Sequence, residues 1–151
     1  MNLEIELVPE TAWGSNLRNK VPKTEWDKIR KQAYQDYNHK CGICRTTNVK
    51  LNCHELWDYD DKNHIQKLKG FIALCDNCHN IKHFGFVNVQ VSKGIWPKNM
   101  LNDLAKHFIK VNNVGLKEFK SHIKECYDKW EKRSKYEWKT DLAKWSNLIS
   151  K

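Results

Sequence analysis

Four cysteines in two Cys-x-x-Cys pairs are the residues of this sequence best suited to chemistry. The pairs are Cys41/Cys44 and Cys75/Cys78. A thiolate pair separated by two residues can turn back onto one cation, and two such pairs make a closed tetrahedral site that zinc favours. The alternatives are two disulfides or idle thiols, but disulfides suit secreted chains. We therefore expect these four cysteines to hold a structural Zn²⁺.

Further potential ligands lie between and directly after these pairs. Cys53 and His54 are adjacent, His79 follows Cys78 directly, and His83 comes four residues later. If a helix begins near Cys78, His79 and His83 share one helical face, because residues four apart are neighbours on a helix. They can then bind a second metal ion.

This arrangement resembles the HNH endonucleases, specifically the Cys₄ subgroup of the ββα-metal (His-Me finger) nucleases. The resemblance covers about residues 24–90 and is carried by Cys41, Cys44, the Cys53-His54 dyad, the segment FIALCDNCH at 71–79, and His83. It implies a small zinc-stapled finger that hydrolyses phosphodiester bonds in DNA, with His54 as general base. It also implies that Cys53, His79 and His83 occupy the ligand positions of a second divalent metal, which is Zn²⁺, Ni²⁺, Mn²⁺ or Mg²⁺.

The chain departs from the family pattern at two positions. Cys53 stands where the family usually has Asp or His, and a thiolate beside two imidazoles favours zinc or another late transition metal over Mg²⁺. Gly70 stands about where the family has the Asn that orients the catalytic histidine, a task that Asn63 or Gln66 can take over. These departures keep open a second interpretation, a catalytically degenerate finger that binds nucleic acid or a protein without cleavage. A redox protein built on Cys-x-x-Cys fits less well, because Cys-His ligands suit metal better than thiol exchange.

The charge balance favours a polyanionic partner. The sequence carries 27 Lys and Arg against 18 Asp and Glu, a formal net charge of +9, and the excess is heaviest in the C-terminal third. Together with the metal motif, this predicts binding to DNA, most simply double-stranded DNA. The predicted contacts are Lys82, Lys117, Lys120 and Lys124, for which solvated helix faces are the alternative.

Length and hydropathy restrict the class of protein. A chain of 151 residues suits one domain, or one small core with an appendage. Mean hydropathy is −0.81 and no long apolar run occurs, which argues against a membrane-spanning helix. The N-terminus lacks the basic-then-apolar pattern of a secretion signal. We therefore expect reduced thiols and a cytoplasmic location, while a protein partner or homodimer stays undecided.

The patterning predicts an α+β fold in three parts. Residues 1–23 form an N-terminal strand, with Leu3, Ile5 and Leu7 alternating with glutamates, and then an irregular arm anchored by Trp13 and Leu17. Residues 24–92 form the metal finger, and residues 93–151 form a basic helical extension packed on it.

Within these parts we expect a helix from 25 to about 37, strands over 49–55 and 71–74 and a polar loop over 57–69. We also expect a metal-binding helix over 78–84 capped by Gly85, two helices after Pro97 that end near Arg133, and a last short helix near the C-terminus.

Overall fold

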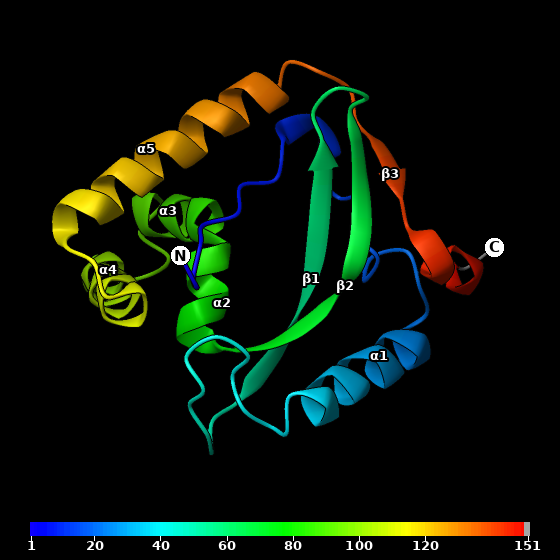
Figure 1. Ribbon diagram of the computed structural model, residues 1–151, viewed down its shortest axis with the longest axis horizontal. Helices are drawn as coiled ribbons and strands as arrows, with labels where there is room; N and C mark the ends of the chain where they lie inside the picture. The colour runs from blue at the N-terminus through cyan, green and yellow to red at the C-terminus, as the bar shows by residue number, and fades with distance from the viewer. Residues whose placement is uncertain (150–151) are drawn as a thin grey trace.

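A long antiparallel hairpin lies at the centre of the computed structural model, which describes residues 1–149 (Figure 1). Strand β1 (Leu51–Asp60) pairs with β2 (Ile65–Cys75), and the short β3 (Lys139–Asp141) runs parallel to β2, giving the sheet order β1-β2-β3. The polar loop predicted for 57–69 is wrong, because the strands continue to a tight turn. Asp60 closes that turn by accepting hydrogen bonds from the backbone N–H groups of Lys62 and Asn63.

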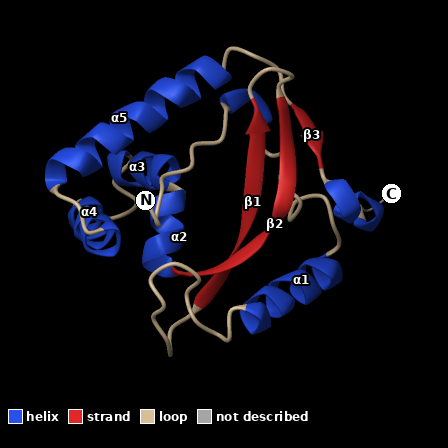
Figure 2. Ribbon diagram, viewed as in Figure 1, coloured by secondary structure: helices blue, strands red, loops and turns tan. Residues whose placement is uncertain are grey.

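Helices cover both sides of this hairpin (Figure 2). On one side lie α2 (Asp76–Lys82), α3 (Phe84–Ser92), α4 (Asn99–Asn112) and α5 (Leu116–Arg133). On the other side lie α1 (Lys23–Asp36) and the 3₁₀ helix η2 (Ala143–Leu148), while a second 3₁₀ turn, η1, spans Glu10–Ala12. Within residues 1–149, every helix is too short or too polar to cross a lipid bilayer.

Two hydrophobic cores hold these layers together. The larger core joins the N-terminal arm, the first cysteine turn and α2 to α5, and it buries Leu3, Leu74, Ile81 and Phe108 almost completely. The smaller core lies among α1, β2 and the C-terminal segment, and contains Leu17, Val21, Trp26, Leu68 and Leu142. Each face of the hairpin is thus supported by its own core, and the two faces offer different surroundings to alternate residues of β1.

The N-terminal arm is extended but forms no strand within residues 1–9, so that prediction is wrong. Leu3 and Ile5 are buried as the alternation predicted. Their backbone N–H groups, however, donate to side chains of the helical layer. Leu3 donates to Asn112 Oδ1 of α4, and Ile5 donates to His122 Nε2 of α5. The arm therefore runs between the hairpin and α5 as a connector (Figure 1).

Three smaller expectations also need correction. Gly85 does not cap a helix but lies inside α3, where an added Cβ would approach Leu7 Cδ2 to 2.9 Å. Trp13 is 63% exposed rather than an anchor, whereas Leu17 is fully buried as expected. The C-terminal segment contributes β3 and η2 rather than one helix, because residues 139–141 pair with β2.

Candidate metal centres

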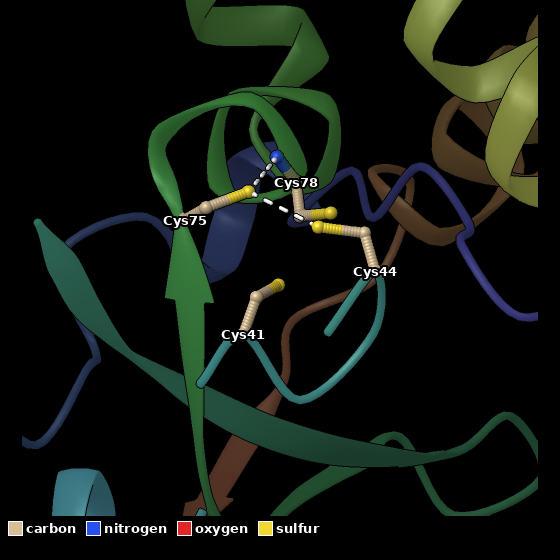
Figure 3. Close-up of side chains that lie close together, drawn as sticks. All are labelled: Cys41, Cys44, Cys75 and Cys78. Atoms are coloured by element: carbon tan, nitrogen blue, oxygen red, sulfur yellow. Dashed lines mark hydrogen bonds between the residues drawn. The ribbon is translucent and has the colours of Figure 1, made fainter. Parts of the chain in front are cut away.

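The four cysteines of the Cys-x-x-Cys pairs converge on one point, which confirms the predicted cluster (Figure 3). Their Sγ atoms lie within 4.8 Å of one another, and Cys44 Sγ is 3.7 Å from Cys75 Sγ. Four sulfurs at the usual Zn–S distance of about 2.3 Å around a tetrahedral ion stand roughly 3.8 Å apart. All six cysteines of the chain are free thiols, so the disulfide alternative is excluded. The donor set and spacing fit zinc.

Local backbone structure brings the two pairs together. Cys75 is the last residue of β2 and the N-cap of α2, where its Sγ accepts the backbone N–H of Cys78. The first pair lies in a turn held to β2 by a hydrogen bond from Gly42 N to Ala73 O. An added Cβ at Gly42 would approach side-chain atoms of Ile72 to 2.7 Å, so the turn can lie this close to the strand only with glycine.

The thiols strongly influence one another's protonation. Hydrogen bonds from Cys75 and Cys78 lower the pKa of Cys41, and the same contact with Cys41 raises the pKa of Cys78. Because neighbouring thiolates repel one another, four of them at this spacing require a cation.

His107 of α4 also reaches this centre, although its position in the sequence predicted only a solvated or packing residue. Its Nε2 lies 3.2 Å from Cys78 Sγ, within reach of an N–H···S hydrogen bond. An imidazole N–H aimed at a ligating sulfur is the kind of supporting contact that orients a metal ligand and tunes its affinity. No spacing rule in the sequence links these residues, because α4 reaches the centre only through the packing of the helices.

Three histidines form a second group with metal-ligand geometry. His54 from β1, His79 from α2 and His83 at the C-cap of α2 each offer a nitrogen within 4.8 Å of the other two. His54 Nδ1 lies 3.2 Å from His83 Nε2. The i, i+4 placement of His79 and His83 on one helix is as predicted. Three imidazoles can bind a cation such as zinc and leave a coordination position open.

This group contains His54 instead of the predicted Cys53. Successive side chains of a strand point to opposite faces. His54 faces α2, where its ring packs edge-on against the rings of His79 and His83. Cys53 packs instead against the smaller core. Burial raises the pKa of Cys53 to about 12, and Glu55 adds to this effect, so Cys53 is a neutral thiol.

His79 and His83 are held in their neutral form. Burial lowers the pKa of His79 to about 3, and nearby His83 and His54 lower it further. Burial and His54 likewise lower the pKa of His83 to about 4. A neutral imidazole has one nitrogen lone pair free, which is the form that binds a metal.

Glu6 of the N-terminal arm joins His54 to Lys82. Its Oε2 lies 2.7 Å from His54 Nε2, and its Oε1 accepts a 2.8 Å hydrogen bond from Lys82 Nζ. Burial alone would raise the pKa of Glu6, but the hydrogen bond from His54 and the ammonium of Lys82 lower it to about 2. The Lys82 side chain is only 10% exposed, so its predicted role as a nucleic-acid contact is wrong.

The residues expected to replace the family's Asn lie elsewhere. Gly70 forms part of a bulge opposite Leu56, with φ of +153°, a conformation that side-chain-bearing residues rarely adopt. Asn63 donates to Asp60 in the hairpin turn, and buried Gln66 donates to Thr140 of β3. The side chain that contacts His54 Nε2 is Glu6. In the sequence, Glu6 stands out only as a carboxylate of the alternating arm segment. No spacing in the sequence linked Glu6 to His54.

A groove of about 480 Å³ runs beside the histidines. It is bounded by β1, which has a free edge in the sheet, by the N-terminal arm and by α5. Exposed Arg18 and Lys129 line it together with Trp57 and Trp130. Carboxylates line it too, so the groove has mixed charge rather than a uniformly basic surface.

The remaining predicted nucleic-acid contacts lie on one exposed helix. Lys117, Lys120 and Lys124 are exposed on α5, and Lys124 pairs with Asp128 one turn later at 2.7 Å. Their exposure suits both contact with a polyanion and plain solvation, so their role in nucleic-acid binding stays a prediction.

Neither a protein-family model, a curated protein nor a solved structure matches this chain. The function is therefore argued from the geometry of the two centres.

Proposed function

We propose that this protein is a metal-dependent endonuclease of the HNH type that hydrolyses phosphodiester bonds in DNA. The observation that carries the proposal is the convergence of His54, His79 and His83 on the hairpin and the helix that follows it, directly beside the four-cysteine group. The order strand, strand, helix, with a cysteine site at the strand–helix junction, is what the resemblance to ββα-metal nucleases implied.

The chemistry of the donors fits this reaction. Imidazole nitrogens suit zinc, nickel and related late transition metals better than Mg²⁺. A divalent cation bound there supplies Lewis-acid stabilisation of the charge that develops on a phosphate. The three side chains hold their nitrogens towards one point, and the adjacent groove gives an extended substrate access to them.

His54 has a different role in this proposal from the one that the sequence predicted. Its Nε2 is engaged by Glu6 and its Nδ1 faces His83, which favours metal ligation over general-base catalysis. The general-base role stays a prediction, and the two roles differ in what a His54→Ala substitution removes. A lost ligand removes the second metal, whereas a lost base leaves the metal in place and slows cleavage by about 10²–10⁴-fold.

The alternative function is a finger of the same fold that binds nucleic acid or a protein without cleavage. It is favoured by the occupation of both nitrogens of His54 and by the bulge glycine at position 70. In this alternative, Lys117, Lys120 and Lys124 contribute binding and the histidine group is structural.

The two functions are separated by a cleavage assay with a parallel metal titration. Purified protein that retains its tightly bound zinc is incubated with supercoiled plasmid and single-stranded RNA in Mg²⁺, Mn²⁺, Co²⁺, Ni²⁺ or Zn²⁺. Binding of Co²⁺ is measured by calorimetry for wild type, His54→Ala and His83→Ala. His39→Asn is the matched control, since His39 is exposed and has φ of 57°, which Asn tolerates.

We expect plasmid cleavage by wild type and His39→Asn, and loss of both cleavage and Co²⁺ binding in His54→Ala and His83→Ala. Co²⁺ binding that survives in His54→Ala while cleavage disappears would restore the general-base role of His54. Absence of cleavage of either substrate with all five metals would refute the nuclease and leave the binding finger.

A further inference from the structure

The N-terminal arm delivers one carboxylate to His54, at the ring nitrogen that does not face His83. Glu6 lies 48 residues before His54 and 76 before Lys82, yet its two carboxylate oxygens contact these two side chains at 2.7 and 2.8 Å. The side chain of His54 is 6% exposed and that of Lys82 is 10% exposed. A carboxylate held between two nearly buried partners is not an ordinary solvated glutamate of an alternating segment.

The contact decides which nitrogen of His54 can bind a metal. A neutral imidazole carries one proton, on Nδ1 or on Nε2. Because an ionised carboxylate only accepts hydrogen bonds, Glu6 requires the proton on Nε2, which leaves the lone pair on Nδ1. Nδ1 is the atom that faces His83 Nε2 at 3.2 Å. Ligating histidines commonly donate their second N–H to a carboxylate in this way, which fixes the ring and increases its basicity.

Lys82 holds the carboxylate in place. It lies in α2 between His79 and His83, and its ammonium donates to Glu6 Oε1. The backbone continues the link, because Glu6 N donates to Lys82 O at 3.0 Å. One residue of the metal-binding helix thus holds Glu6 through both its main chain and its side chain.

We propose that Glu6 is the positioning residue of the three-histidine metal centre, with Lys82 as its counter-charge. The inference rests on the proposed function only in that a metal binds at His54, His79 and His83. It assigns a role to Lys82 within the protein in place of contact with nucleic acid. It also makes the metal centre depend on the arm, which α4 and α5 hold through Asn112 and His122.

The test compares Glu6→Ala and Glu6→Gln with Glu4→Gln, a matched control on the same arm whose side chain is exposed. Calorimetry measures Co²⁺ binding to protein that retains its cysteine-bound zinc. Nitrogen-15 NMR of the histidine rings reports which nitrogen of His54 carries the proton, a signature that a merely structural role would not change. Thermal unfolding shows whether each variant is folded.

We expect Glu6→Ala to weaken Co²⁺ binding by about 10–100-fold and to release His54 from the Nε2–H form. Glu6→Gln keeps an acceptor oxygen but loses the charge, so it should retain the Nε2–H form and lose affinity towards the low end of that range. Glu4→Gln should match wild type in both measurements.

Several results would overturn the assignment. One is unchanged Co²⁺ affinity in Glu6→Ala, or in Glu6→Gln if the alanine variant does not fold. Another is a wild-type His54 protonated on Nδ1, and a third is a wild type that binds no metal beyond its zinc. A wild type that binds Co²⁺ through this arrangement but cuts no nucleic acid would refute the nuclease alone and leave the role of Glu6 standing.

Discussion

At the scale of single residues, the pleat of β1 decides which of two adjacent ligand candidates reaches the second centre. The resemblance implied Cys53 as the ligand and His54 as the general base, but only His54 faces α2. Cys53 packs against the smaller core, where a thiol behaves as a small hydrophobic group. The role of each residue thus follows from the face of the strand on which it lies.

The position of Cys53 predicts how it responds to substitution. Cys53→Asp places a carboxylate beside the smaller core and near Glu55, so we expect a loss of about 1–3 kcal/mol in unfolding free energy and no shift in metal preference towards Mg²⁺. Urea unfolding and Co²⁺ titration measure the two effects. Cys53→Ala is the control and should keep Co²⁺ affinity unchanged. A switch to Mg²⁺ in Cys53→Asp would place residue 53 among the ligands.

Gly70 gives a second prediction at this scale. Because its φ of +153° suits glycine alone, Gly70→Asn should lower the unfolding free energy by about 1–3 kcal/mol and should not increase cleavage. Gly94→Asn is the matched control, since its φ of +72° lies where Asn is tolerated. Unfolding in urea compares the two. Increased cleavage in Gly70→Asn would show that this position is an empty Asn site of the family pattern.

At the scale of elements, the junction of β2 and α2 serves both centres. Cys75 and Cys78 supply two thiols there, and the same helix carries His79 and His83. The junction can be ordered only if the turn that carries Cys41 is held against it. A cation at the four cysteines is therefore expected to stabilise the second centre as well as its own.

Removal of the zinc from the four cysteines should consequently unfold more than the turn that carries Cys41. Structural zinc contributes apparent binding energy of about 10–16 kcal/mol in small domains, so Cys78→Ser should lose one zinc per chain and much of the cooperative unfolding transition. Elemental analysis and thermal unfolding monitored by circular dichroism measure this. Cys126→Ser, outside the cluster, is the control and should retain the zinc. A metal-free protein with an unchanged Tm would contradict the structural role.

The hairpin tip is clamped to the end of α5 by a two-point ion pair. Arg133 donates to both carboxylate oxygens of Asp61, at 2.7 and 2.9 Å, and its guanidinium lies over the ring of Tyr59. The hydrogen bond from Arg133 lowers the pKa of Asp61. The stabilisation is thus fully present above the ordinary Asp pKa and disappears as pH falls through the lowered value.

Asp61→Asn should therefore lower the unfolding free energy at pH 7. It should also remove the part of the pH dependence of that free energy that comes from the Asp61–Arg133 ion pair. Since the Asp61 side chain is 59% exposed, we expect the unfolding free energy at pH 7 to fall by only about 0.2–1 kcal/mol. Urea unfolding at pH 7 and at pH 3 measures the difference, with Asp58→Asn, another exposed carboxylate of the hairpin, as control. An equal effect of Asp61→Asn at both pH values would show that the ion pair contributes nothing.

At the scale of the whole molecule, the excess of basic residues is heaviest in the C-terminal third of the chain. The net charge of +9 gives a general attraction to polyanions. Lys117, Lys120 and Lys124 are exposed on one helix, whereas the groove near the histidines mixes arginine and lysine with glutamates. In the proposed function, α5 therefore supplies affinity and the groove supplies access to the metal centre.

Reversing the charge of all three α5 lysines to glutamate should weaken DNA binding for every sequence. If each lysine contacts one phosphate, the slope of the logarithm of the binding constant against the logarithm of the salt concentration should become shallower by about 2.7. Fluorescence anisotropy over a range of salt concentrations measures it. Reversal of Lys23, Lys28 and Lys31 on α1 changes the net charge equally and is the control. Equal slopes for both triple variants would assign the effect to net charge rather than to the α5 face.

The sequence by itself determined what depends on local spacing. The two Cys-x-x-Cys pairs, the i, i+4 histidines, the helices after Pro97 and the burial of Leu3 and Ile5 follow from residue types a few positions apart. These features are local because the ligands of a Cys-x-x-Cys pair are close in the sequence, and because side chains repeat with a fixed period along a helix or a strand.

Only the tertiary structure decided which distant residues complete each site. Glu6 and His107 reach the two centres through the docking of the arm and of α4, and Cys53 is turned away because α2 packs on the other face of β1. The strands across 57–69 form through hairpin pairing and a bulge at Gly70 rather than through apolar alternation. Such contacts depend on how whole elements pack, and no spacing along the chain encodes them.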